Sequence, residues 1–293
     1  MVSLAELARE RLAGRRLIYL CILLSVTVPM IWKISFKEHA SPMVKNVFDQ
    51  VESLPPGARV LLVFDFDPGT EPEIKPMSDA FTRHLCLKGA KLYCLTLWPT
   101  GPVEIDKVIR NVLTPEFPDY YYGADYINLG FVSGDEAIIA VALTSFQKAF
   151  PTDAHNISTS DTKRLPIMKW VENIRSFNLI IECSGGYPGL PEWIRYAAVP
   201  GGVPIVGGSV AVGTPELFPY VPDQCVGLLA GLKGAAEYEQ LLLERYPLLE
   251  RPECRVALDR MGPQTVAHLA IILFIIIGNG IYLSQKRRGR VGT

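Results

Sequence analysis

From Arg59 onward, apolar runs of strand length alternate with segments in which apolar residues recur at helical spacing. The first run, residues 60–66, ends around two acids, Asp65 and Asp67, which a Pro-Gly break follows. Continuous apolar strands are typical of a parallel sheet that is covered on both faces, and a strand–helix–strand order implies right-handed crossovers. The sequence therefore predicts an α/β fold, a three-layer Rossmann-like sandwich with a mostly parallel sheet of about five strands. The strands are expected at residues 60–66, 92–98, 126–132, 177–183 and 203–206.

The segments between these strands are expected to be helical. Residues 136–150 are so apolar that a helix there should be buried on most sides. Further helices are expected around residues 167–174 and 190–198. The last helix of the domain is expected at residues 226–245, where three glycines would form a small-residue side that another helix could approach closely.

Two apolar stretches, residues 17–33 and 265–284, are each long enough to cross most or all of the hydrocarbon core of a membrane. The alternative for the first stretch is a cleaved signal peptide, although no small-x-small cleavage pattern follows it. The expected order of segments is a tail at 1–16, a transmembrane helix at 17–33, a connector at 34–58, the α/β domain at 59–247, a membrane-proximal connector at 248–264, a transmembrane helix at 265–284 and a basic tail at 285–293.

The charges beside the two stretches predict the orientation of the chain, because lysine and arginine close to a spanning helix tend to remain cytoplasmic. Both tails are rich in such residues, which are Arg9, Arg11, Arg15, Arg16, Lys286, Arg287, Arg288 and Arg290. We therefore expect a two-pass membrane protein with both termini cytoplasmic and the α/β domain extracytoplasmic. Lys33, Lys37 and Lys45 oppose this orientation, and so do five cysteines without metal spacing, which are more typical of a reducing compartment.

In a parallel α/β sheet, ligands bind outside the carboxyl ends of the strands. The residues just after the predicted strands form a polar, glycine-rich rim, where backbone N–H groups could face a ligand. The candidate ligand-binding residues are Asp65, Asp67, Gly69, Ser133, Gly134, Asp135, Ser184, Gly185, Gly186, Gly207 and Gly208, with Thr100, Gly101 and Ser209 beside them. The alternative is that these residues serve only as turn and cap residues of the strand–helix loops.

The segment Val63-Phe-Asp-Phe-Asp-Pro-Gly-Thr70 resembles the nucleophile motif of the haloacid dehalogenase superfamily. The resemblance implies that Asp65 attacks phosphorus, that Asp67 acts as a general acid and base, and that Mg²⁺ offsets the charge. The sequence departs from the family pattern because Pro68 precedes the Gly-Thr pair and no late Gly-Asp-x-x-x-Asp motif follows. A membrane-tethered, Mg²⁺-dependent phosphate-ester hydrolase is thus the alternative function.

Other chemistry finds little support in the sequence. It contains no Gly-x-Ser-x-Gly elbow, no Walker motif and no Gly-x-Gly-x-x-Gly motif. With only 4 histidines, a metal site built on imidazoles is not expected, and the net charge of -1 gives no reason to expect a nucleic-acid partner. The sequence favours a protein that is not an enzyme and needs no cofactor.

The second apolar stretch carries polar and small residues that predict helix packing. His268 and Asn279 interrupt an apolar helix, and Gly278 stands beside the asparagine. Such groups usually face another helix or lie near the membrane surface. The leading expectation is therefore a binding or scaffold subunit of a membrane assembly, whose partners are other membrane-protein subunits or a second copy of the chain.

Overall fold

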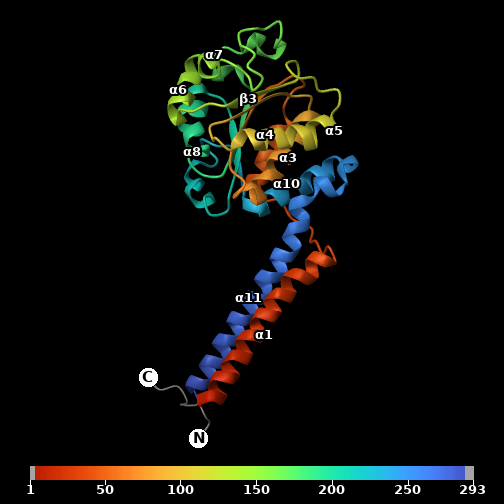
Figure 1. Ribbon diagram of the computed structural model, residues 1–293, viewed down its shortest axis with the longest axis vertical. Helices are drawn as coiled ribbons and strands as arrows, with labels where there is room; N and C mark the ends of the chain where they lie inside the picture. Colours follow the sequence, from red (N-terminus) through yellow and green to blue (C-terminus); the bar gives the residue numbers. More distant parts are fainter. Residues whose placement is uncertain (1–3, 288–293) are drawn as a thin grey trace. The chain divides into compact units, whose positions relative to one another are not determined.

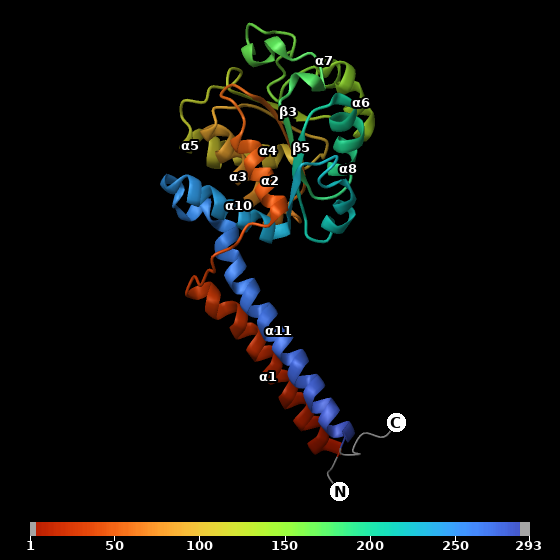
Figure 2. The ribbon, with the colours of Figure 1, turned by 180° about the vertical axis from the view of Figure 1, so that it is seen from behind.

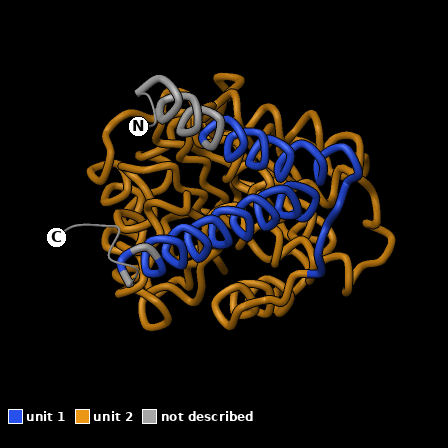
Figure 3. Tube along the Cα trace, turned by 90° about the horizontal axis from the view of Figure 1, so that it is seen from below, with its two compact units in different colours: residues 1–37, 258–293 blue, residues 38–257 orange. Residues whose placement is uncertain are grey.

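Six parallel strands form one sheet, in the order β3-β2-β1-β4-β5-β6. The structure is a computed structural model that describes residues 4–287. It contains two compact units, residues 38–257 with the sheet and residues 1–37 with 258–293, which Figure 3 colours separately. The strands are β1 (Arg59–Asp65), β2 (Lys91–Thr96), β3 (Tyr126–Phe131), β4 (Leu179–Ser184), β5 (Ile205–Ser209) and β6 (Gly227–Ala230).

Helices cover both faces of the sheet (Figures 1 and 2). On one face lie α2 (Pro42–Glu52), α3 (Glu71–Leu87), α4 (Gly101–Val108) and α10 (Gly231–Arg245). On the other face lie α6 (Asp135–Thr144), α7 (Phe146–Ala149) and α8 (Leu190–Trp193), which a π-helical segment, Ile194–Ala198, continues. The prediction of an α/β fold of the Rossmann type, with helices on both sides of a parallel sheet, is confirmed.

Strand β1 lies in the middle of the sheet, between β2 and β4. Its residues from Val60 to Asp65 are all buried, which explains why the strand reads as a continuous apolar run. The chain moves from β1 to β2 and β3 on one side and then crosses to β4 on the other side. The connections therefore reverse direction between β1 and β4, where Asp65 and Ser184 are register partners at the strand ends.

Two glycines of β5 allow helices to approach the sheet from opposite faces. A Cβ atom added at Gly207 would lie 2.8 Å from the Leu190 side chain of α8. A Cβ atom added at Gly208 would lie 2.4 Å from Met77 Sδ of α3. The predicted fifth strand therefore continues through both glycines, and they belong to the interior of the sheet.

The sixth strand, β6, corrects the prediction that residues 226–245 form one helix. Gly227 begins this strand, and a Cβ atom there would lie 2.4 Å from the carbonyl oxygen of Met43 in α2. Gly231, at a φ of +55°, then starts α10. Gly227 and Gly231 thus mark a close backbone approach and a turn, and only Gly234 lies on the side of a helix, where an added Cβ atom would lie 2.7 Å from the backbone of Leu229. The sheet was predicted to be mostly parallel with about five strands. It has six strands, and all of them are parallel.

Two other helix predictions need correction. The segment at 136–150 breaks at Ser145, whose backbone is extended, and in α6 only Ile139 and Ala142 are buried. Five of the ten residues of α6 are exposed, because the helix meets the core along only one side although it is apolar on all of them. Residues 167–174 do not form an α-helix but parts of two short 3-10 turns, Pro166–Trp170 and Ile174–Ser176.

Five cysteines lie in the sheet unit, and all of them are buried and free. Burial raises the pKa of the Cys94 thiol to about 12 and also raises that of Cys183. These thiols are therefore protonated and act as small apolar core residues.

The other unit contains α1 (Leu4–Ile31) and α11 (Val256–Arg287), which run antiparallel and side by side in Figures 1 and 2. Within the described residues one helical segment, Val256–Ser284, is long and apolar enough to cross a membrane. Helix α1 does not meet this criterion, so the prediction of an N-terminal span is not supported. After Arg16 its uncharged part runs only to Ile31, about 22 Å of helix, which is shorter than a hydrocarbon core of about 30 Å. Of the basic C-terminal tail, Arg288 and Arg290 lie outside the described residues.

Candidate functional site

Asp65, at the end of β1, lies entirely inside the protein. Its Oδ1 accepts hydrogen bonds from the Leu97 backbone N–H at 2.6 Å and from Thr96 Oγ1 at 3.2 Å. Its Oδ2 accepts the indole N–H of Trp193 at 3.0 Å. The side chain therefore ties together β1, the end of β2 and α8. Both of its oxygens are engaged with the protein.

The ionisation of Asp65 reflects this position. Burial raises the pKa of the carboxyl group to about 7, although the donors from Leu97, Trp193 and Thr96 act in the opposite direction. The negative charge of Glu192 adds a smaller increase. Such a carboxyl can change protonation near neutral pH.

Asp67 lies apart from Asp65 in the loop that follows β1. Its carboxylate accepts the Thr70 backbone N–H and hydroxyl, both at 2.9 Å, and these bonds lower its pKa. The neighbouring Gly69 is exposed on the same turn. Within the described residues no group of three or more His, Cys, Asp or Glu side chains could hold a metal ion. Asp65 and Asp67 thus have different structural roles. Asp65 holds elements of the core together, whereas Asp67 stabilises a turn.

The loop that follows β3 reaches the loop that follows β4 through one hydrogen bond. Ser133, Gly134 and Asp135 are exposed, and Gly134 and Asp135 have φ values of +138° and +46°. The next residue, Glu136, accepts a hydrogen bond of 2.5 Å from the Tyr187 hydroxyl. The bond lies at the surface and joins the two loops over the sheet edge.

The predicted rim residues after β2 serve close packing. A Cβ atom at Gly101 would lie 2.0 Å from Thr96 Oγ1, so the start of α4 can pass the end of β2 only with glycine there. Thr100 donates its hydroxyl to the carbonyl oxygen of Phe66 at 3.4 Å. Neither residue borders the cavity described next.

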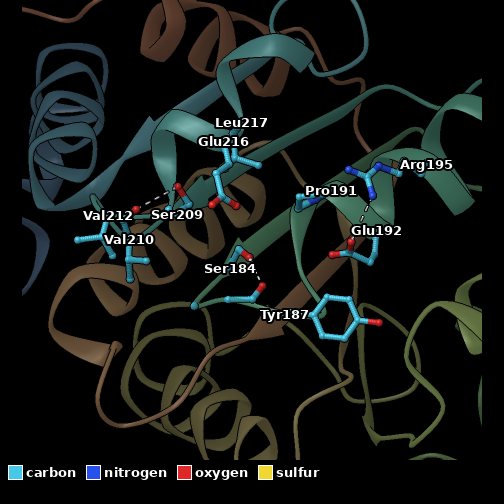
Figure 4. A pocket seen from close by; sticks show the side chains of 13 residues that line it. Ser184, Tyr187, Pro191, Glu192, Arg195, Ser209, Val210, Val212, Glu216 and Leu217 are labelled. Atoms are coloured by element: carbon cyan, nitrogen blue, oxygen red, sulfur yellow. Dashed lines mark hydrogen bonds and ion pairs between the residues drawn. The ribbon is translucent and has the colours of Figure 1, made fainter.

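A cavity of about 370 Å³ lies at the carboxyl ends of β4 and β5 (Figure 4). Its walls are the loop after β4, the beginning of α8 and the loop after β5. Of the predicted residues, the structure brings Ser184, Gly185 and Gly186 together here, with Ser209 beside them. The other candidates, from Asp65 to Asp135 and the two β5 glycines, do not line it. The cavity is within the range of small-molecule sites.

Hydrogen bonds hold both loops of the cavity in place. Ser184 Oγ accepts the Leu190 N–H at 3.3 Å, and Glu192 Oε2 accepts the Gly189 N–H at 3.0 Å. On the opposite wall, Ser209 Oγ and Thr214 Oγ1 are 3.0 Å apart. These bonds are all made within the protein and hold the walls of the cavity in position.

The charged side chains of the cavity are two glutamates and one arginine. Glu192 and Arg195 lie on the α8 side, with the guanidinium Nη1 3.8 Å from Glu192 Oε1. Arg195 also donates to the hydroxyl of Tyr220 through Nε and Nη2. Glu216 extends from the β5 side, and Figure 4 shows its carboxylate directed toward the space above Ser184.

Glu182 is a buried acid two residues before the cavity residue Ser184. It is 0% exposed, and neither carboxylate oxygen has a hydrogen-bond partner among the described residues. Burial raises its pKa well above the usual value, and the negative charges of Asp65 and Glu192 raise it further. Both effects favour the protonated form of the Glu182 carboxyl group.

The sequence predictions missed most of the cavity side chains, namely Glu182 behind it and Tyr187, Glu192, Arg195 and Glu216 in its wall. Only Glu182 carried a visible signal, since it is the single acid within the apolar run of the fourth strand. The others lie in helix and loop positions that look like ordinary surface residues. These residues border the same cavity only because of the paths that the two loops follow, and sequence patterns do not specify those paths.

The residues predicted to pack in the second membrane stretch lie in α11. His268, Gly278 and Asn279 are exposed there, and a Cβ atom at Gly278 would meet nothing within 4 Å. Among the described residues, no helix therefore packs closely against α11 at Gly278.

The sequence matches no protein-family model, and no curated protein shows significant similarity to it.

Proposed function

We propose that this protein is a membrane-anchored binding protein, in which the α/β unit takes a small polar molecule into the cavity at the ends of β4 and β5. The observation that carries the proposal is the position of the cavity, at the carboxyl ends of β4 and β5 and next to the point where the strand order reverses between β1 and β4. Ligands of open parallel α/β sheets bind in this region. The polar groups of Ser184, Glu192 and Glu216 at the wall would give the site specificity.

The hydrolase alternative has weaker support. A nucleophile must reach its substrate, whereas Asp65 is buried and all its donors come from the protein. Asp67 is engaged by Thr70, and neither acid borders the cavity. We therefore favour binding over phosphate-ester hydrolysis.

The binding proposal can be tested by closing the cavity at its lip. Val212 borders the cavity and is 89% exposed, so Val212→Trp adds bulk there without disturbing the core. The full-length protein and this variant are incubated with a mixture of cellular metabolites, and bound compounds are identified by mass spectrometry after rapid separation. The wild type should retain a compound that Val212→Trp loses.

The matched control is Val103→Trp, at a half-exposed position of α4 that does not border the cavity. It should retain the same compound. Retention by Val212→Trp, or no retained compound in any protein, would refute binding in this cavity.

We also propose a two-pass topology with both termini cytoplasmic and the α/β unit extracytoplasmic. Support comes from the antiparallel course of α1 beside α11 and from the basic residues at the ends of both helices. The uncharged part of α1 is short, but Arg15, Arg16 and Lys33 can extend their ammonium and guanidinium groups to the membrane surface.

Labelling with a membrane-impermeant maleimide tests this topology, because the native cysteines of the sheet unit are buried. Thr162→Cys places a thiol on an exposed loop of the unit. In intact cells it should react, whereas a thiol introduced at Thr293 should react only after lysis. The reverse pattern would refute the orientation.

Finally, we propose that the protein is a subunit of a membrane assembly or associates with itself. The support is the exposed position of His268 and Asn279 on an otherwise apolar helix, since polar groups within a membrane usually find a protein partner. Native gel analysis of mild detergent extracts should show a complex larger than one chain. His268→Leu with Asn279→Leu should dissociate it, and Ile272→Leu should not. Migration of the wild type as a lone monomer would oppose the proposal.

A further inference from the structure

The charge of the cavity wall is unevenly distributed. Glu192 uses Oε2 to accept the Gly189 N–H, and Arg195 is held between Glu192 and the Tyr220 hydroxyl. Glu216 also borders the cavity, but its carboxylate has neither a hydrogen bond nor an ion pair with any described residue. The cavity thus contains one guanidinium, which already has partners, and two carboxylates, of which only that of Glu216 has no partner among the described residues.

We propose that the cavity binds an aliphatic primary amine, whose ammonium group lies between Glu216 and Glu192 with Ser184 beneath it. This rests on the proposed function, since it names the chemical class of the ligand for the same cavity. In Figure 4 both carboxylates project toward the space above Ser184. Anionic ligands such as phosphate esters would meet the net negative charge of the wall, which disfavours them.

The rest of the wall suits a short hydrocarbon chain. Pro191, Val210, Val212 and Leu217 contribute apolar surface to the cavity. At about 370 Å³ the space accepts a small molecule and not a folded segment of a protein. An ammonium group at one end and a few methylene groups behind it would therefore satisfy both kinds of surface.

Two buried acids, Asp65 and Glu182, interact electrostatically with Glu192 of the cavity wall. The charge of Glu192 is one of the causes that raise the pKa of both Asp65 and Glu182. An ammonium ion beside Glu192 would offset that charge and lower the pKa of both groups. Binding near neutral pH should therefore release protons from the protein, which a site without these acids would not do.

Three probes of equal chain length test the proposal: butylamine, butanol and butyrate. Their binding to the full-length protein in detergent is measured by equilibrium dialysis and by saturation-transfer NMR. Butylamine should bind about tenfold more tightly than butanol, and butyrate more weakly still, because hydrogen bonds to charged groups contribute about 1.5 kcal/mol or more. Calorimetry in buffers of different ionisation enthalpy should show proton release with butylamine alone.

Glu216→Gln keeps the size of the side chain but removes its charge, and it should weaken butylamine binding about tenfold. The residue is exposed, so the variant is expected to fold. Glu172→Gln, at an exposed position outside the cavity, should leave binding unchanged.

The outcomes separate this inference from the proposed function. If butanol or butyrate binds as tightly as butylamine, and Val212→Trp blocks that binding, the cavity is a binding site but does not select an ammonium group. If butylamine binds equally to Glu216→Gln and the wild type, the assignment of Glu216 is wrong. If no probe and no metabolite binds, both proposals fall.

Discussion

The indole N–H of Trp193 donates to Oδ2 of Asp65 at 3.0 Å, and both residues are fully buried. This hydrogen bond joins the central strand β1 to α8, the helix that forms one wall of the cavity. It therefore couples the core of the sheet to the site.

Replacing Trp193 by phenylalanine should destabilise the protein by about 2–4 kcal/mol. The change removes volume from the core and leaves Asp65 Oδ2 without its donor, which should also move the titration of Asp65 to higher pH. The free energy of unfolding is measured by urea denaturation at several pH values. Trp170→Phe is the control, because Trp170 is 67% exposed and the change should stay within about 0.5 kcal/mol. Equal effects of the two changes would show that the buried hydrogen bond contributes nothing.

The stability of the wild type should fall, relative to Asp65→Asn, as pH rises from about 4 to about 7. The folded protein binds a proton on Asp65 more tightly than the unfolded chain does, since the pKa of this carboxyl is raised from about 3.8 to about 7. Its contribution to stability is complete below the unfolded pKa and is lost as pH passes the folded pKa. The difference between the two proteins should change by up to about 4 kcal/mol across this interval. A difference that does not vary with pH would contradict the raised pKa.

Glu182→Leu should stabilise the protein at neutral pH by about 1–3 kcal/mol. The substitution replaces a buried acid that has no hydrogen-bond partner among the described residues with an apolar side chain of similar size. Thermal unfolding at pH 7 provides the measurement. Glu172→Leu, at an exposed position, should change the stability by less than about 0.5 kcal/mol. Destabilisation by Glu182→Leu would mean that the carboxyl group has a partner such as a bound water.

The two glycines of β5 should differ in their tolerance of a methyl group. At Gly207 the added Cβ would lie 2.8 Å from the backbone carbonyl oxygen of Glu182, which cannot move away, so Gly207→Ala should cost about 3 kcal/mol or more. At Gly208 the close neighbour is the flexible end of Met77, and Gly208→Ala should cost less. Gly213→Ala is the control, since its Cβ would meet Val210 only at 3.6 Å. The order Gly207, Gly208, Gly213 in urea denaturation is the expected result, and a reversed order would refute it.

The sequence was sufficient for the fold class because the cause of the pattern is local. Strands such as β1 are buried on both faces, so each of them appears as an apolar run. In helices such as α3, apolar residues recur at helical spacing. The pattern failed at β6, where four residues beginning with Gly227 are too short and too small to be distinguished from the start of a helix. It also failed at residues 136–150, because apolar composition does not reveal which side of a helix meets the core.

The site could be predicted only in part. The rule that ligands bind at strand ends selected Ser184, Gly185 and Gly186, and these residues line the cavity because position along the strand is enough to place them. It also selected Gly207 and Gly208, whose real role is to let helices approach the sheet. Glu216 and Arg195 could not be found, because the sequence does not show that the segment after β5 and the π-helical segment Ile194–Ala198 border the same cavity.

The packing of α2 against β6 has a consequence for how the chain is completed during synthesis. Asn46 of α2 donates to the carbonyl oxygen of Val226 beside β6, and these residues are 180 positions apart. At ordinary rates of translation, α2 leaves the ribosome roughly 10–40 s before its partner strand exists. During that interval Phe48 can already pack against His84 of α3, whereas Val47 lacks its native neighbour Gly227. Helix α2 is therefore synthesised before the rest of the α/β unit but completes its native contacts late. A chaperone that binds this nascent chain should be found on α2.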